Sequence, residues 1–312
     1  MATYIARRFG TLLLTMLIVT VGIFALMHSV PGGPFEIVNS KQPLPPFAYE
    51  NIKRKYGLDL PIWQQYLRWL WAALHGDFGI PFESPTETVT SLIARAWPVT
   101  LRVGGLTLLL AYSVGLFLGT LAAVKQNSWI DSLATFLATL GIGLPNFVFG
   151  FLLIEVFAVM LHWFPTGGCC HPNQLVLPVV AYALAPMANI ARYTRASTLE
   201  VMRTEYVTMA RARGLPEWRV LRRYVLRTAL IPLITILGPS IPDILTGSFL
   251  IESQFALPGL GNYFTTASQE RDYPTIMALA LLTCVLWGVL YLLSDVAYTL
   301  VDPRVRLEGL SR

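Results

Sequence analysis

Charged residues are scarce in this sequence. Asp, Glu, Lys and Arg together make up 13% of its 312 residues, whereas soluble domains carry about 25%. The hydrophobic share is 54% and the mean hydropathy is +0.57. This composition excludes an ordinary soluble domain and predicts a protein that crosses a membrane several times.

Motifs for nucleotide binding and covalent catalysis are also missing. The sequence contains no Gly-x-x-x-x-Gly-Lys-Ser/Thr phosphate-binding loop, no Gly-x-Ser-x-Gly nucleophile motif and no paired metal-ligand motif. We therefore expect no enzyme activity, no cofactor and no metal on this chain, and we disfavour an intramembrane hydrolase. No internal duplication is visible, which argues against an ion-driven secondary transporter built from repeats.

Cysteine is rare, with three residues in the whole chain. Cys169 and Cys170 are adjacent in an expected loop. They form either a strained vicinal disulfide or two unpaired small residues, and we favour the unpaired state. Cys284 lies in an apolar run, where we expect it to fill space between helices.

Apolar runs long enough to cross a bilayer are the main positive signal, because about 20 apolar residues span a hydrocarbon layer roughly 30 Å thick. The sequence predicts an all-α membrane protein with six transmembrane helices. Four runs are regular: 9–30, 103–124, 132–154 and 274–294. Two more, 175–191 and 228–251, are interrupted by prolines, and we expect them to face protein neighbours rather than lipid.

These runs divide the chain into an N-terminal helix (1–30), an extracytoplasmic segment (31–98), a transmembrane core (99–302) and a tail (303–312). Residues 192–232 form a long loop within the core. Arg7 and Arg8 precede the first run, as in a signal peptide. Its apolar part is too long for one, however, and no small-residue cleavage motif follows, so we expect a retained anchor.

The distribution of Lys and Arg predicts the orientation. Residues 1–8, the turn at Lys125, residues 192–227 and the tail after Asp302 hold 15 of the 23 basic residues. In the segment 31–98, six basic and six acidic residues cancel. Both termini and the loop 192–232 are therefore expected in the cytoplasm.

A helix with one apolar stripe is expected in the segment between the first two runs. The sequence "LPIWQQYLRWLWAALHGDFG" places six large side chains at helical spacing: Trp63, Tyr66, Leu67, Leu70, Trp71 and Leu74. Such a stripe suits a helix at the membrane–water boundary or one packed on the transmembrane helices. His75 and Asp77 follow it, and we favour a turn there over a metal site.

The stretch 205–232, "EYVTMARARGLPEWRVLRRYVLRTALIP", is strongly basic. A helix-compatible run over 194–213 ends at Gly214, and Pro216 starts another helix, which predicts a helix–turn–helix joint. On the second helix one face is basic (Arg219, Arg222, Arg223, Arg227) and the opposite face is apolar (Trp218, Leu221, Val225, Ala229).

Two interpretations of this stretch remain. The arginines can rest on anionic lipid headgroups. Alternatively, a short helix docks into a groove on a soluble partner and brings small or apolar residues to close approach: Ala210, Ala212, Gly214 and Leu215.

The stretch resembles the cytoplasmic coupling loop, or EAA loop, of bacterial importers of the ATP-binding cassette class. More narrowly, the chain resembles the oligopeptide/dipeptide permease branch. Further matching segments follow in order: "YIARRFGTLLLT", "VPGGPF", "HGDFG", "LAAVKQNSWID", "LHWFPTGG", "IARYTRASTLEVM", "TGSFLIESQFALPGLG", "RDYP" and "DPRVR". Their order and spacing along nearly the whole chain carry the resemblance.

The resemblance implies that the loop contacts a nucleotide-binding subunit, and that Gly214 matches the family's central glycine. The contact residues it implies are Glu205, Tyr206, Met209, Ala210, Arg211, Ala212, Gly214 and Leu215. The wider consensus Glu-Ala-Ala would fall on residues 208–210, where only the last small residue is retained. Individual roles for Thr208 and Met209 therefore stay open.

Ionisable residues inside apolar runs are candidates for a substrate path. We expect Glu155 and Asp295 to be structural, since both lie near helix ends. Asp243 lies mid-run, and we expect it to face the translocation cavity and meet a cationic group of the substrate. A buried ion pair, or a hydrogen bond to a companion subunit, is the alternative.

Further candidates surround Asp243 in the sequence. Ser240, Ser248 and Glu252 are expected along the same path. In the "LPGLG" segment, the family comparison assigns Pro258, Gly259 and Gly261 to an external gate. Packing alone can also require these glycines.

In function, the resemblance implies a permease subunit of an ATP-driven importer in the bacterial inner membrane, which carries peptides delivered by an extracytoplasmic binding protein. Its partners would be a second homologous permease, two cytoplasmic subunits that hold ATP and Mg, the binding protein and membrane lipid, without nucleic acid. Nickel, glutathione and oligosaccharides remain alternative substrates, because similar permeases carry them.

Overall fold

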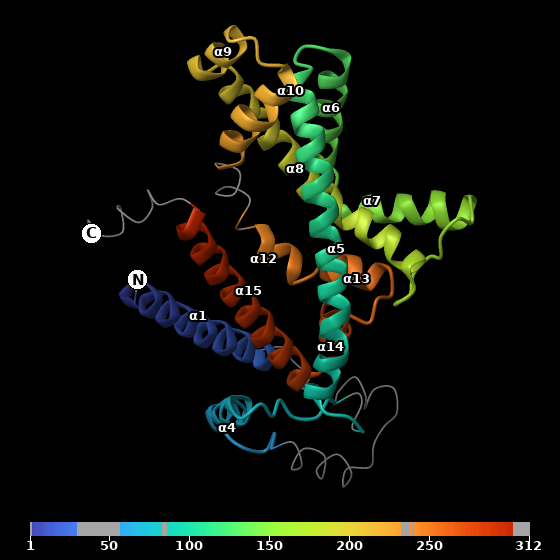
Figure 1. Ribbon diagram of the computed structural model, residues 1–312. Coiled ribbons are helices and arrows are strands. Elements are labelled where there is room, and N and C mark those ends of the chain that lie inside the picture. Colours follow the sequence, from blue (N-terminus) through green and yellow to red (C-terminus); the bar gives the residue numbers. More distant parts are fainter. Residues whose placement is uncertain (1, 30–56, 83–85, 232–237, 239, 302–312) are drawn as a thin grey trace. The chain divides into compact units, whose positions relative to one another are not determined.

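The computed structural model of the chain describes residues 2–29, 57–82, 86–231, 238 and 240–301. Every regular element in these ranges is a helix, so the all-α prediction is confirmed (Figure 1). The chain forms two compact units. One comprises Met1–Thr100 and Pro258–Gly288, and the other comprises Leu101–Leu257 and Val289–Arg312.

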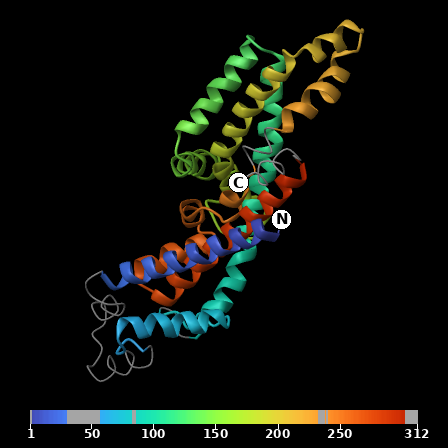
Figure 2. The ribbon, with the colours of Figure 1, turned by 90° about the vertical axis from the view of Figure 1, so that its left-hand side faces the viewer.

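In the first unit, α1 (Ala2–Ser29) lies beside the part of α15 (Tyr273–Val301) that ends at Gly288 (Figures 1 and 2). Gly288 allows this approach, because a Cβ there would collide with the side chain of Leu12. At the other end of the pair, the hydroxyl of Tyr273 donates a hydrogen bond to the carbonyl of Met27 over 2.9 Å.

The core of this unit joins α15 to α14 (Leu260–Glu270) and to the start of α5 (Val89–Val124). Its buried residues are Val89, Ile93, Ala96, Leu260, Ala278 and Leu279. The Leu260 amide donates to Thr100 Oγ1 over 2.9 Å, which satisfies one of the open amides at the start of α14.

Helix α4 (Ile62–Leu74) confirms the predicted helix. Tyr66 turns toward α1, where its hydroxyl lies 2.9 Å from Thr20 Oγ1. Four other members of the stripe point away and are exposed: Trp63 at 62%, Leu67 at 53%, Trp71 at 70% and Leu74 at 73%. The helix thus packs on α1 through Tyr66, at the edge of the predicted stripe, and leaves the rest of that apolar face largely uncovered.

The predicted turn after α4 is confirmed. His75 Nδ1 donates to the Trp71 carbonyl over 2.8 Å, and Asp77 Oδ1 accepts from the Gly79 amide over 2.9 Å. Both side chains therefore serve the turn.

In the second unit, the predicted span 132–154 is bent. Helix α6 (Trp129–Gly143) ends there, and α7 (Asn146–Leu153) with the π-helical segment η1 (Ile154–Met160) continues at an angle of 106° to it. Leu144 is extended, with φ −90° and ψ 119°, because Pro145 follows it. The ring of a proline excludes helical geometry at the preceding residue.

Helix α8 (Pro172–Met202) is longer than the predicted run 175–191 and passes through Pro178 and Pro186 without a break. Half of its most apolar window is buried, which agrees with the expectation that it faces protein. Four described helices are long and apolar enough to cross a membrane, or five if the bent α6–η1 pair counts as one span. The predicted number of six is not reproduced.

The predicted run 228–251 lies partly outside the described residues, which omit 232–237 and 239. Its described part is helical at 228–231 and contains two short helices, α12 (Ser240–Leu245) and α13 (Phe249–Gln254). Gly247 separates them with φ 87°, a left-handed conformation that ends a helix.

Helix α8 makes a close backbone contact with α5. A Cβ at Gly119 would collide with the Ala191 carbonyl and lie 2.7 Å from Thr194 Cβ, and one at Gly115 would lie 2.8 Å from Ile190 Cγ2. Two glycines one turn apart therefore let the two backbones touch, as small residues do between membrane helices.

An ion pair holds α6 to α8. The Asp131 carboxylate is 4% exposed and accepts two hydrogen bonds from Arg195, from Nε over 2.5 Å and from Nη2 over 2.8 Å. Asp131 also accepts from the Asn127 amide over 3.0 Å, which caps the start of α6. This two-pronged contact sets the register between the helices.

The loop between η1 and α8 contains the cysteine pair. Cys169 and Cys170 form a disulfide, so the unpaired state favoured from the sequence is wrong. The Gly168 amide donates to the Phe255 carbonyl over 2.9 Å, which anchors this loop to the end of α13. Cys284 is a free, half-buried thiol in α15.

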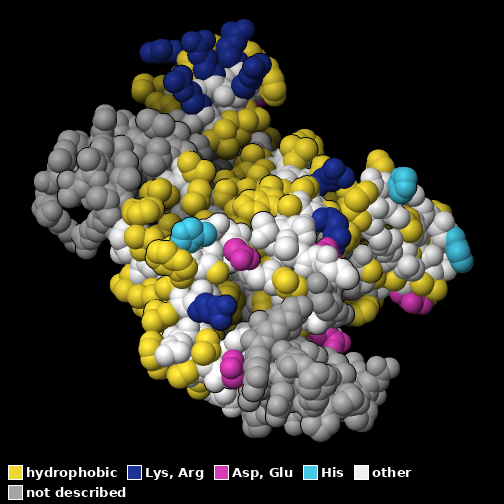
Figure 3. Space-filling model, turned by 90° about the horizontal axis from the view of Figure 1, so that it is seen from below, with side chains coloured by type: hydrophobic (Ala, Val, Ile, Leu, Met, Phe, Trp, Pro, Cys, Tyr) yellow, Lys and Arg dark blue, Asp and Glu magenta, His cyan; other side chains and the backbone are white. Residues whose placement is uncertain are grey.

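Large apolar side chains remain exposed on the span helices, and hydrophobic side chains cover much of the face in Figure 3. Leu14 and Ile18 on α1, Phe117 on α5 and Phe136 on α6 are each more than half exposed. Exposure on this scale suits surfaces covered by lipid. Glu155 is exposed on η1, whereas the Asp295 side chain lies outside the described residues.

The α5–α8 contact predicts different effects for alanine substitutions at two glycines of one helix. Gly119→Ala should lower stability by about 1–3 kcal/mol, because the added methyl group cannot fit against Ala191. Gly105 has nothing within 4 Å of its missing Cβ, so Gly105→Ala should leave stability unchanged or raise it by up to about 1 kcal/mol. Thermal unfolding of the detergent-purified variants measures both effects, and equal melting temperatures would contradict the contact.

Candidate functional site

The helix–turn–helix joint predicted after residue 192 is present. Helix α9 (Glu205–Ala212) is followed by Gly214 with φ 76°, and Pro216 then precedes α10 (Glu217–Val220), which continues as the π-helical segment η2 (Leu221–Leu226). One helix over 194–213 is wrong. Thr204 is extended, with φ −73° and ψ 151°, and separates α8 from α9.

The joint has a small hydrophobic core of its own. Its buried residues are Val201, Val207, Ala210, Val220, Val225 and Ala229, and Leu215 packs against them from the turn. Ser197 Oγ donates to the Ala229 carbonyl over 2.8 Å, which fastens the returning chain to α8. Because α9, α10 and the end of α8 share one core, the joint can move with α8 as a single body.

An ion pair crosses the turn. Arg211 Nε donates to Glu217 Oε1 over 2.8 Å, and its Nη2 lies 3.5 Å from Oε2. The pair is partly exposed, so its stabilising effect is at most about 1 kcal/mol. The ion pair also links α9 to α10 across the turn, which restricts the angle between the two helices. Arg211 thus belongs to the frame of the joint, and the sequence analysis did not identify Glu217 as its partner.

The residues implied in partner contact divide into two groups. Glu205, Tyr206, Met209, Ala212 and Gly214 are exposed. These five define what we call the coupling surface.

The other implied contact residues serve the interior. Ala210 is 4% exposed and Leu215 is half-buried, since both pack in the core of the joint. Ala210 therefore presents little surface to a partner, and the contact roles of both residues stay predictions. Thr208 and Arg213 are exposed beside the coupling surface, and neither was among the predicted contacts.

The basic face is confirmed, and its opposite face needs a correction. Val225 and Ala229 are buried, but Trp218 is 67% exposed and lies with the arginines, because residues 218 and 222 are one turn apart. The Arg222 Cζ atom lies 5.9 Å from the centroid of the Trp218 ring. A depression of about 470 Å³ is lined by Trp218, Arg219, Arg222, Arg223 and Arg227.

The predicted substrate-path residues do not form one surface. Asp243 and Ser240 belong to α12, and the Asp243 side chain is exposed. Its backbone carbonyl accepts a hydrogen bond from the Tyr182 hydroxyl over 2.9 Å, which fixes α12 against α8. Glu252 on α13 is 1% exposed, and Ser248 caps that helix by accepting from the Ile251 amide over 3.4 Å. Of these two carboxylates, Asp243 is exposed and Glu252 is buried.

The predicted gate residues are mostly buried. Gly259 has φ −100° and ψ 175°, an extended conformation open to any residue, and Gly261 is buried in the first turn of α14. Pro258 is half-buried. The sharp turn falls instead on Ala256, with φ 49°. These observations favour packing as the reason for the two glycines, and a gate role stays a prediction.

Gln254 at the end of α13 is a residue that the sequence analysis missed. Both atoms of its side-chain amide are buried without a hydrogen-bond partner among the described residues. A Cβ at Gly150 would lie 2.7 Å from Gln254 Oε1, so only glycine gives this amide room against α7. Nothing in the local sequence pattern signals this contact, which depends on the bend between α6 and α7.

The sequence comparisons with known proteins agree over nearly the whole chain. Residues 115–307 match the family described as "Binding-protein-dependent transport system inner membrane component", and residues 1–104 match its N-terminal family, "Binding-prot-dependent transport system membrane comp, N-term". The dipeptide transport system permease protein DppB of Bacillus subtilis is 40% identical over 308 residues, which are 99% of each chain.

Two further relatives have similar coverage. The dipeptide permease DppB of Lactococcus lactis is 37% identical over 98% of this chain and 100% of its own length. The oligopeptide transport system permease protein OppB of Escherichia coli K12 has the same identity and coverage.

Among solved structures, the inward-facing MetNI methionine ABC transporter (CY5 native crystal form) matches with a TM-score of 0.57 and 19% identity, over 68% of this chain and 96% of that one. This likeness supports the fold. From its sequence and its helical architecture, the chain belongs to the family of binding-protein-dependent transport system inner membrane components.

Proposed function

We propose that this chain is a permease subunit of an ATP-driven importer and that it carries peptides. The observation that carries the proposal is the exposed coupling surface. It belongs to a joint that has its own core and that continues directly from α8, a candidate membrane span. The names of the relatives, dipeptide and oligopeptide permeases, supply the substrate class. Nickel, glutathione and oligosaccharides are the alternative cargoes.

The geometry suits the transmission of movement. Helix α9 starts three residues after α8 ends, and both contribute to the core of the joint. A force on the coupling surface therefore acts on α8, which is packed on α5 through glycines and paired to α6 through Asp131 and Arg195. Coupling of this kind needs a contact that differs between two states of the partner.

The partner at the coupling surface would be a nucleotide-binding subunit that holds ATP and Mg. A complete importer would need two such subunits and a second permease, because the spans of one chain enclose little space. An extracytoplasmic binding protein would deliver the substrate. The distribution of Lys and Arg supports cytoplasmic positions for the joint and both termini.

For the substrate path we propose Asp243, whose exposed carboxylate suits the amino group of a peptide. Its position on α12, bounded by Pro242 and by the turn at Gly247, places it at a break between short helices. Such breaks expose backbone carbonyls as well, which are further acceptors for a cationic group.

Cross-linking tests the coupling surface. A photoreactive cross-linker on Ala212→Cys should capture an ATPase subunit in native membranes, because residue 212 is exposed. The same reagent on Ala210→Cys should capture none, since residue 210 is 4% exposed in the core of the joint. Mass spectrometry of the adducts identifies the partner. Adducts of equal yield at both positions, or none at 212, would contradict the proposal.

Two glycine variants distinguish a coupling role of Gly214 from the effect of backbone strain. Gly214 and Gly76 have similar φ values, 76° and 79°, and neither has an atom within 4 Å of its missing Cβ. Valine is strained at both positions. Gly214→Val should abolish peptide uptake while the protein still inserts in the membrane, whereas Gly76→Val should retain most uptake. Equal loss would assign the effect to strain and remove the coupling role.

Replacement of one carboxylate tests the substrate path. Asp243→Asn should reduce uptake of peptides with a free amino terminus by about tenfold, which corresponds to about 1.4 kcal/mol of lost interaction. Glu155→Gln is the matched control, because Glu155 is also an exposed carboxylate in an apolar run, on η1. Radiolabelled dipeptide uptake measures both. Unchanged uptake in Asp243→Asn would exclude Asp243 from the path.

A further inference from the structure

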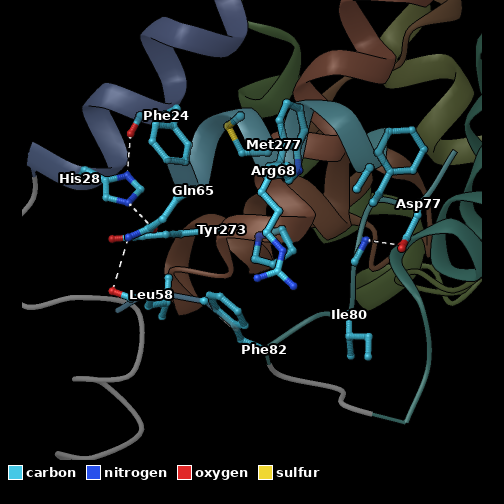
Figure 4. Close-up of a pocket in the computed structure, with 16 residues that line it drawn as sticks. Phe24, His28, Leu58, Gln65, Arg68, Asp77, Ile80, Phe82, Tyr273 and Met277 are labelled. Carbon is cyan, nitrogen blue, oxygen red and sulfur yellow. Dashed lines mark hydrogen bonds between the residues drawn. The ribbon is translucent and has the colours of Figure 1, made fainter. Parts of the chain in front are cut away.

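A cavity of about 370 Å³ lies in the first unit, and none of its lining residues belongs to the sites described above. The end of α1, the inner side of α4, the turn after α4 and the start of α15 surround it (Figure 4). Most of its walls are apolar or aromatic, among them Phe24, Trp69, Phe78 and Met277. The volume is within the range of small-ligand sites, about 300–1,000 Å³.

Helix α4 presents two opposite faces. Gln65, Arg68, Trp69 and Ala72 line the cavity, and their spacing of i, i+3, i+4 and i+7 defines one side of a helix. The exposed apolar residues Trp63, Leu67, Trp71 and Leu74 define the opposite side. The single charged residue of α4, Arg68, therefore lies on the face that lines the cavity.

Most other polar groups of the cavity are engaged within the protein. His28 Nδ1 lies 2.9 Å from the Phe24 carbonyl, and Nε2 lies 3.3 Å from Gln65 Oε1. The Gln65 Nε2 atom donates to the Leu60 carbonyl over 2.8 Å. Tyr273 donates to Met27. These bonds shape the wall and leave few groups for a ligand.

Arg68 is the exception. Its guanidinium lies among the lining residues, between Phe82 and Ile80 in the view of Figure 4 and near Gly57. Among the described residues it has no hydrogen-bond or ion-pair partner, and Asp77, the carboxylate of the same cavity, lies beyond ion-pair distance. One oxygen of Asp77 accepts the Gly79 amide, and the other is open. The cavity thus contains one cationic group, the Arg68 guanidinium, and one separate carboxylate, Asp77, and its other walls are mostly apolar.

The position of the cavity limits what can enter it. It adjoins the last turns of the candidate span Arg8–Ser29 and the first turns of the candidate span Tyr273–Leu293. The ends of spans lie where the hydrocarbon layer meets the headgroups. The Trp and Leu side chains on the outer face of α4 suit the same boundary.

From these observations we propose that the cavity binds a glycerophospholipid with an ethanolamine headgroup. Arg68 pairs with the phosphate, Asp77 accepts from the ammonium group, and the apolar wall of Phe24, Trp69 and Met277 contacts an acyl chain. Arginine suits this role because its planar donors match phosphate oxygens. Under the orientation proposed above, the lipid belongs to the outer leaflet.

Native mass spectrometry of the delipidated complex tests this proposal. Phosphatidylethanolamine and phosphatidylglycerol with identical acyl chains are titrated separately. The unaltered protein should bind one phosphatidylethanolamine more tightly than phosphatidylglycerol. Arg68→Gln should weaken its binding at least tenfold, and Asp77→Asn should remove the preference between the two headgroups.

Two further variants make the result decisive. Arg102→Gln is the charge-matched control, because Arg102 is exposed on α5 and does not line the cavity. It should bind lipid like the unaltered protein. Ala72→Phe fills the cavity without changing its charges and should also lose the lipid.

Equal lipid binding by Arg68→Gln and Arg102→Gln would overturn the proposal, as would retention of lipid by Ala72→Phe. Competition by inorganic phosphate or by a free dipeptide at the same concentration would assign the cavity to a small solute and would also overturn it. Size-exclusion chromatography confirms that each variant is folded before titration. Loss of peptide uptake is not a readout here, so the outcome is independent of the proposed function.

Discussion

The close contact between α5 and α8 is the interaction on which the functional part of the molecule depends. Hydrocarbon gives helices no hydrophobic reason to associate, so their contact depends on how closely the backbones can approach. Gly115 and Gly119 let α5 reach the backbone of α8 near Ile190 and Ala191. With the ion pair to α6, this contact makes α8 a rigid base for the joint at its end.

Breaks between helices decide where ligands and partners can reach the backbone. Pro145 turns the chain by 106° between α6 and α7, and Gly247 separates α12 from α13 beside Asp243. Pro178 and Pro186, by contrast, leave α8 unbroken. The difference is physical: a proline bends or ends a helix where the freed carbonyls find other partners, and a helix packed on both sides can absorb it.

The joint shows how one short segment provides both a frame and a surface. On α9, Val207 and Ala210 lie on the buried face, and Met209 and Ala212 lie on the exposed face. The cavity beside α4 shows the same division, with Arg68 on one face and Trp71 on the other. In both places, different faces of a single helix have different surroundings.

The sequence by itself determined the membrane class, the all-α fold, the family and the joint at Gly214, because apolar runs, basic loops and Gly–Pro punctuation act over a few neighbouring residues. It also located the turn after α4. The tertiary structure alone decided which residues of a helix face inward: Ala210 rather than Ala212, and Trp218 beside Arg222. It likewise decided the bend after Gly143, the pairing of Asp131 with Arg195 and the cavity at Arg68. These features join residues that are distant in the chain, and local spacing carries no information about which surfaces will meet.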